Sequence, residues 1–151
     1  MNIKDLAAPF PPNKIHWRPG ATSSKDGKKS AIPLAYLDAR DVMERLDEVC
    51  GTDFWQNKHP FNGCCEISIL TENGWVTKSN GAGKTQIEGE KGEYSDSFKR
   101  AAVLWGIGRY LYDIPNIWMP LNQYNKFDKS TIVQLTAKIE TWQLKKFGEK
   151  K

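Results

Sequence analysis

Residues 64–81 read CCEISILTENGWVTKSNG and give the clearest indication of the fold class. Cys65, Ile67 and Ile69 alternate with more polar residues, which is the period of a β-strand with one buried face. The letters TENG that follow end in an Asn-Gly pair, a strong signal for a hairpin turn. We therefore predict an antiparallel sheet with strands at 54–58, 64–70 and 75–80.

The letters GAGKT at residues 81–85 match the end of a phosphate-binding loop. The complete loop has the form G-x-x-x-x-G-K-[ST], so its first glycine should stand five residues before Gly83. That position is Lys78, and a lysine does not suit a backbone that must curl to point its amides at phosphates. The segment also follows an antiparallel strand, whereas the loop belongs between a strand and a helix. We therefore expect no nucleotide cofactor, and we interpret these glycines as a flexible exit from the third strand.

The segment 93–115 reads EYSDSFKRAAVLWGIGRYLYDIP and predicts a helix that begins at Ser95 or Ser97 and ends at the final proline. Gly106 and Gly108 would lie inside this helix, at a cost of about 1 kcal/mol each relative to alanine. Close packing or a function should offset that cost. The expected packing face consists of Phe98, Ala101, Ala102, Trp105 and Tyr112.

Lys99 and Arg100 form a basic pair that we expect near the N-terminal half of this helix. The positive end of the helix dipole opposes a cation there. The pair is therefore either a solvated surface feature or a site for an anionic ligand.

Residues 36–51, YLDARDVMERLDEVCG, predict a second helix upstream of the strands. Asp38 suits its N-cap and Gly51 suits its C-terminal stop. Arg40 falls in the first turn, where the helix dipole again disfavours a cation. Either Asp38 or Asp41 neutralises Arg40, or Arg40 serves an anionic ligand.

The chain has 151 residues, of which 39% are hydrophobic and 26% charged, enough for one domain with a hydrophobic core. Its net charge of +4 is compatible with a polyanionic partner. No apolar run suits a membrane span, and the N-terminus does not resemble a secretory signal. Cys50, Cys64 and Cys65 are an odd set without the spacing of a zinc site, so we expect no metal and a reducing cytoplasm.

Composition divides the chain into three segments of one domain. In the first, the sequence PGATSSKDGKKS reads as a flexible loop, and its Lys25, Lys28 and Lys29 are either solvated or near a phosphate backbone. In the last, an apolar stripe predicts an amphipathic helix capped by Asp128 or Ser130. The segments are an N-terminal arm with the basic loop at 1–33, a core at 34–115, and a C-terminal connection with the amphipathic segment at 116–151.

The predicted order is a helix, three antiparallel strands and a helix with the motif D-x-x-K-R-A-x-x-x-x-G-x-x-x-Y, from Asp96 to Tyr110. This arrangement resembles the DNA-binding domain of the Rad52 single-strand annealing family, including its compact phage relatives. The likeness extends upstream to YLDARDVMERLDEVCGTDFW and GWVTKSNGAG, and it covers residues 15–115.

The resemblance implies an α+β fold, with a three-stranded antiparallel sheet packed on helices, in subunits that assemble into a homo-oligomeric ring. Single-stranded DNA would lie in a basic groove, and complementary strands would anneal without ATP in homologous recombination and DNA repair. Residues 34–115 would form the annealing core of a protein that is not an enzyme. The implied partners are an exonuclease or a single-strand binding protein, in the cytoplasm of a bacterial host if the protein is encoded by a phage.

The resemblance also assigns roles to particular residues. Lys99 and Arg100 look like the family's paired phosphate contacts, and Arg40 matches an arginine at the start of the upstream helix. Lys84 lies near a further DNA-contacting lysine beyond the third strand. Annealing needs a strand held by its phosphates with the base edges free, and this requires cations rather than a catalytic group. The expected DNA-binding residues are Arg40, Lys78, Lys84, Lys99 and Arg100.

Two other functions stay open at this point. The carboxylates Glu88, Glu90, Glu93 and Asp96 suggest a metal-dependent nuclease, although a helix start accounts for them as capping and solvation. Alternatively, the chain is a structural oligomer that binds no DNA. Metal-dependent shortening of DNA would reveal the nuclease, and an absence of DNA binding would favour the structural oligomer.

Overall fold

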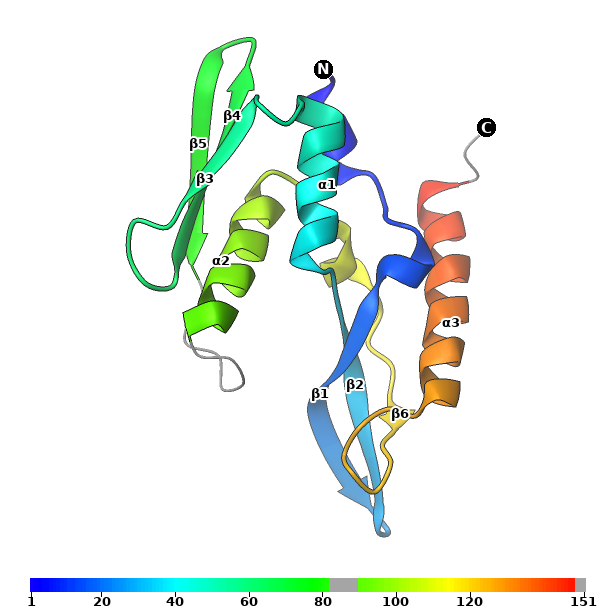
Figure 1. Ribbon diagram of the computed structural model, residues 1–151. Coiled ribbons are helices and arrows are strands. Elements are labelled where there is room, and N and C mark those ends of the chain that lie inside the picture. The colour runs from blue at the N-terminus through cyan, green and yellow to red at the C-terminus, as the bar shows by residue number, and fades with distance from the viewer. Residues whose placement is uncertain (82–89, 149–151) are drawn as a thin grey trace. The chain divides into compact units, whose positions relative to one another are not determined.

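The computed structural model describes residues 1–81 and 90–148 (Figure 1). In these residues it contains three α-helices and two three-stranded antiparallel sheets, which confirms the predicted α+β class. The chain packs as two compact units. Unit 1 comprises Met1–Ala8 and Leu37–Tyr110, and unit 2 comprises Pro9–Tyr36 and Leu111–Lys151.

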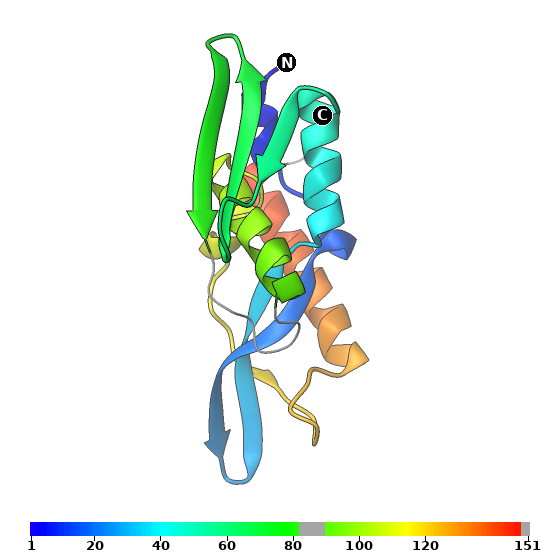
Figure 2. The same ribbon diagram turned by 60° about the vertical axis from the view of Figure 1, so that its left-hand side comes forward.

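The sheet of unit 1 is the one that the sequence predicts. It consists of β3 (Trp55–Lys58), β4 (Cys64–Thr71) and β5 (Gly74–Gly81), with β4 in the middle (Figure 2). Cys65, Ile67 and Ile69 are completely buried, which confirms the buried face that the alternating pattern predicts. On the other face, the Ser68 hydroxyl lies 2.7 Å from the hydroxyl of Thr77 on the neighbouring strand.

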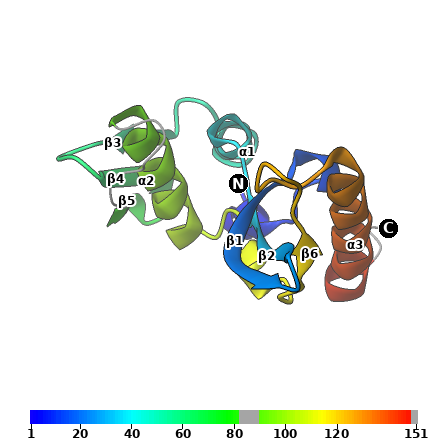
Figure 3. The same cartoon turned by 90° about the horizontal axis from the view of Figure 1, so that it is seen from below.

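Helix α2 (Glu90–Leu104) packs against β4 and β5 (Figure 3). Phe98, Ala101 and Ala102 of this helix are buried, as the sequence predicts. The two alanines allow the helix to approach its neighbours closely, because they present only a methyl group each. Trp105, directly after the helix, donates its indole N–H to the carbonyl oxygen of Ile67 on β4 at 3.0 Å.

The predicted ends of this helix were wrong. Ser95 and Ser97 are inside α2, and the Ser97 hydroxyl bonds the carbonyl of Tyr94 instead of capping a helix start. The helix ends at Leu104, so Gly106 and Gly108 lie beyond it and not inside it. Both glycines have positive φ angles, 97° and 73°, which a residue with a Cβ adopts only under strain. They turn the chain into the short 3₁₀ helix η3 (Arg109–Asp113), where Tyr112 is exposed rather than packed.

Helix α1 (Ala39–Cys50) has the predicted N-cap residue, Asp38, and ends at Gly51, whose φ is 95°. Its buried residues are Val42, Leu46 and Cys50. A 3₁₀ helix, η1 (Ile3–Ala7), packs on it and buries Leu6 completely.

Unit 2 holds a sheet that the sequence analysis missed. It consists of β1 (His16–Lys25), β2 (Lys28–Tyr36) and the two-residue β6 (Met119–Pro120), in the order β1-β2-β6. The loop that was expected to be flexible is a β-hairpin, closed by Asp26 and Gly27 with φ angles of 53° and 76°. An Asp-Gly pair between two strands is a preferred hairpin turn, and this was the overlooked signal.

Helix α3 (Lys129–Phe147) completes unit 2, after the 3₁₀ helix η2 (Pro12–Lys14). Its N-cap is Asp128, one of the two predicted positions, and Leu135 and Ile139 are buried as the apolar stripe predicts. Residues 1–33 supply Leu6 to unit 1 and Phe10 to unit 2 as buried side chains. The division into segments 1–33, 34–115 and 116–151 stays a prediction about domains.

Candidate nucleic-acid interface

The basic pair Lys99 and Arg100 lies on α2, and both side chains are half-buried. Because α2 begins at Glu90, the pair lies past the middle of the helix rather than near its N-terminus. The expected conflict with the helix dipole is therefore wrong for these two residues, since the effect is confined to the first and last turns.

Arg100 is oriented by a carboxylate one turn earlier on the same helix. Its Nε lies 3.4 Å from Oδ1 of Asp96, in an i,i+4 pair with both side chains about one-third exposed (29% and 36%). An ion pair this exposed contributes little to stability. A guanidinium has five N–H donors, so a contact with one carboxylate does not exclude a contact with a phosphate.

Arg40 is the second residue of α1 and is exposed. Asp38 occupies the N-cap position of α1. Its side chain accepts no hydrogen bond from the backbone N–H groups of the first turn, which is the bond that a capping aspartate usually makes. Arg40 therefore lies in the first turn of α1, as the sequence predicts, and Asp41 follows it in the same turn. Helices α1 and α2 contact each other, which places Arg40 and the pair Lys99 and Arg100 on neighbouring helices of one unit.

Lys78 is an exposed residue of β5, paired across the sheet with Ile67. Its ammonium lies 4.8 Å from the centre of the Trp105 ring and donates to the carbonyl of Leu104 at 3.4 Å. Lys78 therefore reaches the C-terminal end of α2, where a cation is favoured by the helix dipole. This position supports a structural role for Lys78, and its contact with DNA stays a prediction.

Arg109 is a cation that sequence reasoning missed. Its Nε and Nη2 donate to the carbonyl of Val103 at 3.0 and 2.8 Å, and Nη2 also donates to the carbonyl of Leu104 at 2.8 Å. It thus bonds two of the carbonyls that a helix end leaves without partners. The sequence carried a signal for this role, because Arg109 stands three positions after Gly106, which suits a helix stop. A basic side chain at that place is favoured by the negative C-terminal end of a helix.

Two expected features fall wholly or partly outside the described residues. Lys84 and Glu88 are in the segment 82–89, and nothing is described of the side chain of Glu90. Of the remaining carboxylates of the proposed nuclease cluster, Glu93 is buried and Asp96 pairs with Arg100.

Within residues 1–81 and 90–148, no three His, Cys, Asp or Glu side chains lie close enough together to hold a metal ion. In the same part of the chain, no helix combines the length and the apolar character that crossing a membrane requires.

The fold and this site define an α+β protein in which a three-stranded sheet packs on a helix that carries a Lys-Arg pair. The chain belongs to the Rad52/22 family of double-strand break repair proteins, whose family model matches residues 3–64 and 62–130. No solved structure gives a significant match to the chain.

Two curated relatives share the name single-stranded DNA-binding protein DdrA. The protein of Deinococcus radiodurans is 38% identical over 119 residues, which cover 76% of this chain and 56% of the relative. The protein of Deinococcus deserti is 38% identical over 133 residues, covering 79% of this chain and 60% of the relative. The matched part of the chain thus spans less than two thirds of the length of these relatives.

Proposed function

We propose that this protein binds single-stranded DNA and anneals complementary strands without ATP, in homologous recombination and DNA repair. The observation that carries the proposal is the family match over residues 3–130 together with the Lys-Arg pair of α2. The name of both DdrA relatives supports single-stranded DNA as the ligand.

The cations of unit 1 are suited to phosphates rather than to bases. Lys99 and Arg100 on α2 and Arg40 on α1 are the residues that we propose to contact the DNA backbone. Phosphate contacts supply affinity that is independent of sequence and sensitive to salt. A strand held in this way keeps its base edges free, so base pairing itself selects the complementary strand. No nucleophile or acid–base pair is needed for this process, and we propose that the protein is not an enzyme.

We extend this proposal to assembly and partners. The protein would work as a homo-oligomeric ring, which allows many subunits to hold one strand, and it would act in the cytoplasm. An exonuclease that exposes single strands, or a single-strand binding protein, is the proposed partner class. Lys84 stays a proposed DNA contact from its position in the sequence alone.

The test combines binding, annealing and particle size on the same preparation. Anisotropy of a labelled oligonucleotide should show affinity for single strands that falls as salt rises, with a slope of about 0.7 for each phosphate contact. Annealing of complementary oligonucleotides should proceed at the same rate with and without ATP and magnesium. Negative-stain images and sedimentation should show closed particles of uniform size.

Each alternative gives a different result in these measurements. Shortening of the oligonucleotide in magnesium or manganese, abolished by Glu93→Gln or Asp96→Asn, would establish the nuclease instead. Uniform oligomers with no affinity for DNA at low salt would establish the structural oligomer. A strict need for ATP would overturn the interpretation of Lys78 in the incomplete phosphate loop.

A further inference from the structure

Unit 2 carries an apolar pocket between its first two strands and α3. Its volume is about 200 Å³. Sites for small-molecule ligands usually measure about 300–1,000 Å³, so this pocket suits one apolar side chain rather than a cofactor. The lining residues are three apolar residues of the segment 114–117, together with Trp17, Pro33, Leu135, Lys138, Ile139 and Trp142.

The walls of this pocket are partly open to solvent. Leu135 and Ile139 are buried, whereas the side chains of Trp17, Ile117 and Trp142 are half-buried. Exposed apolar surface that lines a hollow is typical of binding sites. The pocket is therefore a candidate for an apolar group from outside unit 2.

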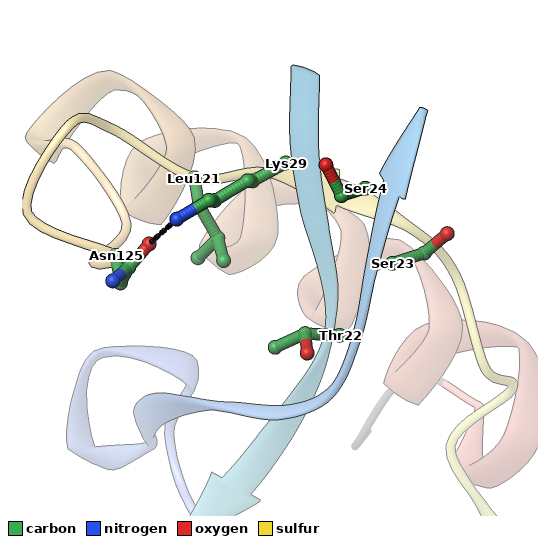
Figure 4. Close-up of a pocket in the computed structure, with 6 residues that line it drawn as sticks. All are labelled: Thr22, Ser23, Ser24, Lys29, Leu121 and Asn125. Atoms are coloured by element: carbon green, nitrogen blue, oxygen red, sulfur yellow. Dashed lines mark hydrogen bonds between the residues drawn. The ribbon is translucent and has the colours of Figure 1, made fainter. Parts of the chain in front are cut away.

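A polar pocket beside the β1–β2 turn provides a comparison (Figure 4). Its cation, Lys29, donates to the side-chain oxygen of Asn125 at 3.2 Å. That ammonium therefore already has an acceptor within unit 2. The lysine of the apolar pocket differs, because within residues 1–81 and 90–148 no ion pair or hydrogen bond involves the side chain of Lys138.

Three lysines of α3 lie on the pocket side of the helix. Lys138 lines the pocket, and Lys145 and Lys146 follow about two helical turns later, which returns them to the same face. The Lys146 ammonium lies 5.6 Å from the centre of the Trp142 ring and 3.5 Å from a carboxylate oxygen of Asp113. Asp113 offsets one of the three charges, so this side of the helix stays positive.

The polar side-chain groups of the pocket are donors. They are the indole N–H groups of Trp17 and Trp142 and the ammonium of Lys138, since the other lining residues are Ile, Leu and Pro. The N–H of Trp17 is buried, and no described residue accepts a hydrogen bond from it. A buried donor without an acceptor costs stability. The pocket therefore matches an occupant that combines an apolar side chain with acceptor oxygens.

We propose that this pocket binds an acidic segment of a partner protein. One apolar side chain of the segment, such as Phe, fills the pocket, and the carboxylates of the segment face Lys138, Lys145 and Lys146. A carbonyl oxygen of the bound segment supplies the acceptor that Trp17 lacks. An apolar anchor in a pocket, surrounded by complementary charge, is common in protein interfaces. The inference rests on the proposed function in one respect, because it gives the partner proposed there a binding surface.

A nucleobase fits the pocket less well than an apolar side chain does. Every base carries N–H donors on its edges, and the lining side chains offer no acceptor to them. A base in the pocket would leave these donors unpaired, which is costly away from water. A second copy of the chain is also disfavoured, because its net charge of +4 has the same sign as the lysines.

The test uses a fluorescein-labelled synthetic peptide, Gly-Asp-Asp-Phe-Asp-Asp-Gly, and measures its anisotropy with the full chain. We expect a Kd on the order of 100 μM at low salt. Replacing the Phe of the peptide by Ala should weaken binding about tenfold, because the pocket loses its apolar occupant. Replacing every Asp by Asn should weaken binding by a similar factor, because the lysines lose their partners.

Lys138→Glu reverses the charge at the pocket and should weaken binding of the peptide about tenfold. Lys129→Glu is the matched control. It makes the same change at an exposed residue of α3 that stands about two and a half turns before Lys138, on the opposite face of the helix. Lys129→Glu should bind the peptide as the wild type does, and the two variants should bind single-stranded DNA equally.

A second pair of variants tests the apolar wall. Ile117→Ala removes part of the wall and should weaken binding of the peptide about threefold to tenfold. Val133→Ala removes apolar surface of α3 outside the pocket and should have no effect. Melting temperatures verify that both variants fold. Lys99→Ala combined with Arg100→Ala should leave the affinity for the peptide unchanged, whereas a peptide held by the proposed DNA contacts would be lost.

Three results would each overturn the proposal: no binding of the peptide, equal binding of the Phe and Ala peptides, or an equal loss in Lys138→Glu and Lys129→Glu. With peptide binding unchanged, a change of particle size in Lys138→Glu would assign the pocket to a second copy. A loss of single-strand affinity in Lys138→Glu alone would assign it to DNA instead.

The proposed function and this inference fail in different ways. If the wild type binds and anneals DNA but does not bind the peptide, this inference fails while the proposed function stands. Binding of the peptide at the pocket without any affinity for DNA would give the opposite result.

Discussion

The ammonium of Lys78 lies 4.8 Å from the centre of the Trp105 ring, and it bonds the Leu104 carbonyl at the end of α2. A cation over an exposed aromatic face contributes about 0.5–1 kcal/mol. We expect Lys78→Ala to lower the free energy of unfolding by about that amount. If Lys78 also contacts DNA, the salt slope of binding should fall by about 0.7. Urea denaturation and anisotropy measure the two effects separately, and an unchanged stability would contradict the structural role.

Lys99→Ala and Arg100→Ala should each weaken single-strand binding at all DNA sequences and flatten its salt slope. Arg100→Ala also removes the ion pair with Asp96, at a cost of at most about 1 kcal/mol. Asp96→Asn is the matched control, because it breaks the same ion pair but keeps the cation. It should show the same fall in stability with unchanged affinity. Normal binding by both alanine variants would show that the Lys-Arg pair is not part of the interface.

Arg40→Ala should reduce affinity for single strands while the oligomer stays intact. Removing a cation from the first turn of α1 relieves its repulsion with the helix dipole, so stability should rise by a few tenths of a kcal/mol. Two measurements on Arg40→Ala, its DNA affinity at low salt and its melting temperature without DNA, distinguish a DNA-binding role from a structural role. Unchanged binding with a lower melting temperature would mean that Arg40 is a structural residue.

Arg45 holds the N-terminal residues of unit 1 onto α1. Its Nη1 donates to the carbonyls of Leu6 and Ala8, at 3.0 and 2.6 Å, and burial lowers the pKa of the guanidinium. Arg45→Met keeps the apolar stem but leaves both carbonyls without this donor. We expect the free energy of unfolding to fall by about 2–3 kcal/mol, as measured by urea denaturation. Arg40→Ala, on the same helix, should show no such fall.

The buried thiol of Cys65 predicts a fall in stability at alkaline pH. Its side chain is completely buried in the sheet of unit 1, and burial raises the pKa of the thiol from 9.0 to about 11. The folded protein therefore keeps a proton that the unfolded chain releases, and the free energy of unfolding should fall as pH rises from 9 towards 11. The free energy of unfolding of Cys65→Ala should decline less steeply over this pH range, as measured by denaturation curves recorded at each pH. Equal slopes would show that the thiol contributes nothing to the pH dependence.

The elements that the sequence predicted well are those with local signals at both ends. Helix α1 has its cap residue and its glycine stop directly beside its two ends, and β4 and β5 are joined by the short turn Glu72-Asn73, directly before Gly74. The alternation of Cys65, Ile67 and Ile69 also identified the buried face correctly, since the period of a strand depends only on its backbone geometry. The Lys-Arg pair was found in the same way, as a motif within one helix.

Tertiary structure decided the features that depend on distant residues. The β1-β2-β6 sheet needs Ala31 to pair with Met119, and a two-residue strand such as β6 has no periodicity of its own. Helix α2 begins at Glu90, which leaves the Lys-Arg pair away from the helix start, and two glycines of positive φ follow its end. Lys78 meets Trp105 only because β5 and α2 pack together. A turn or a cap is a property of a few consecutive residues, whereas these contacts exist only once separate elements have folded against each other.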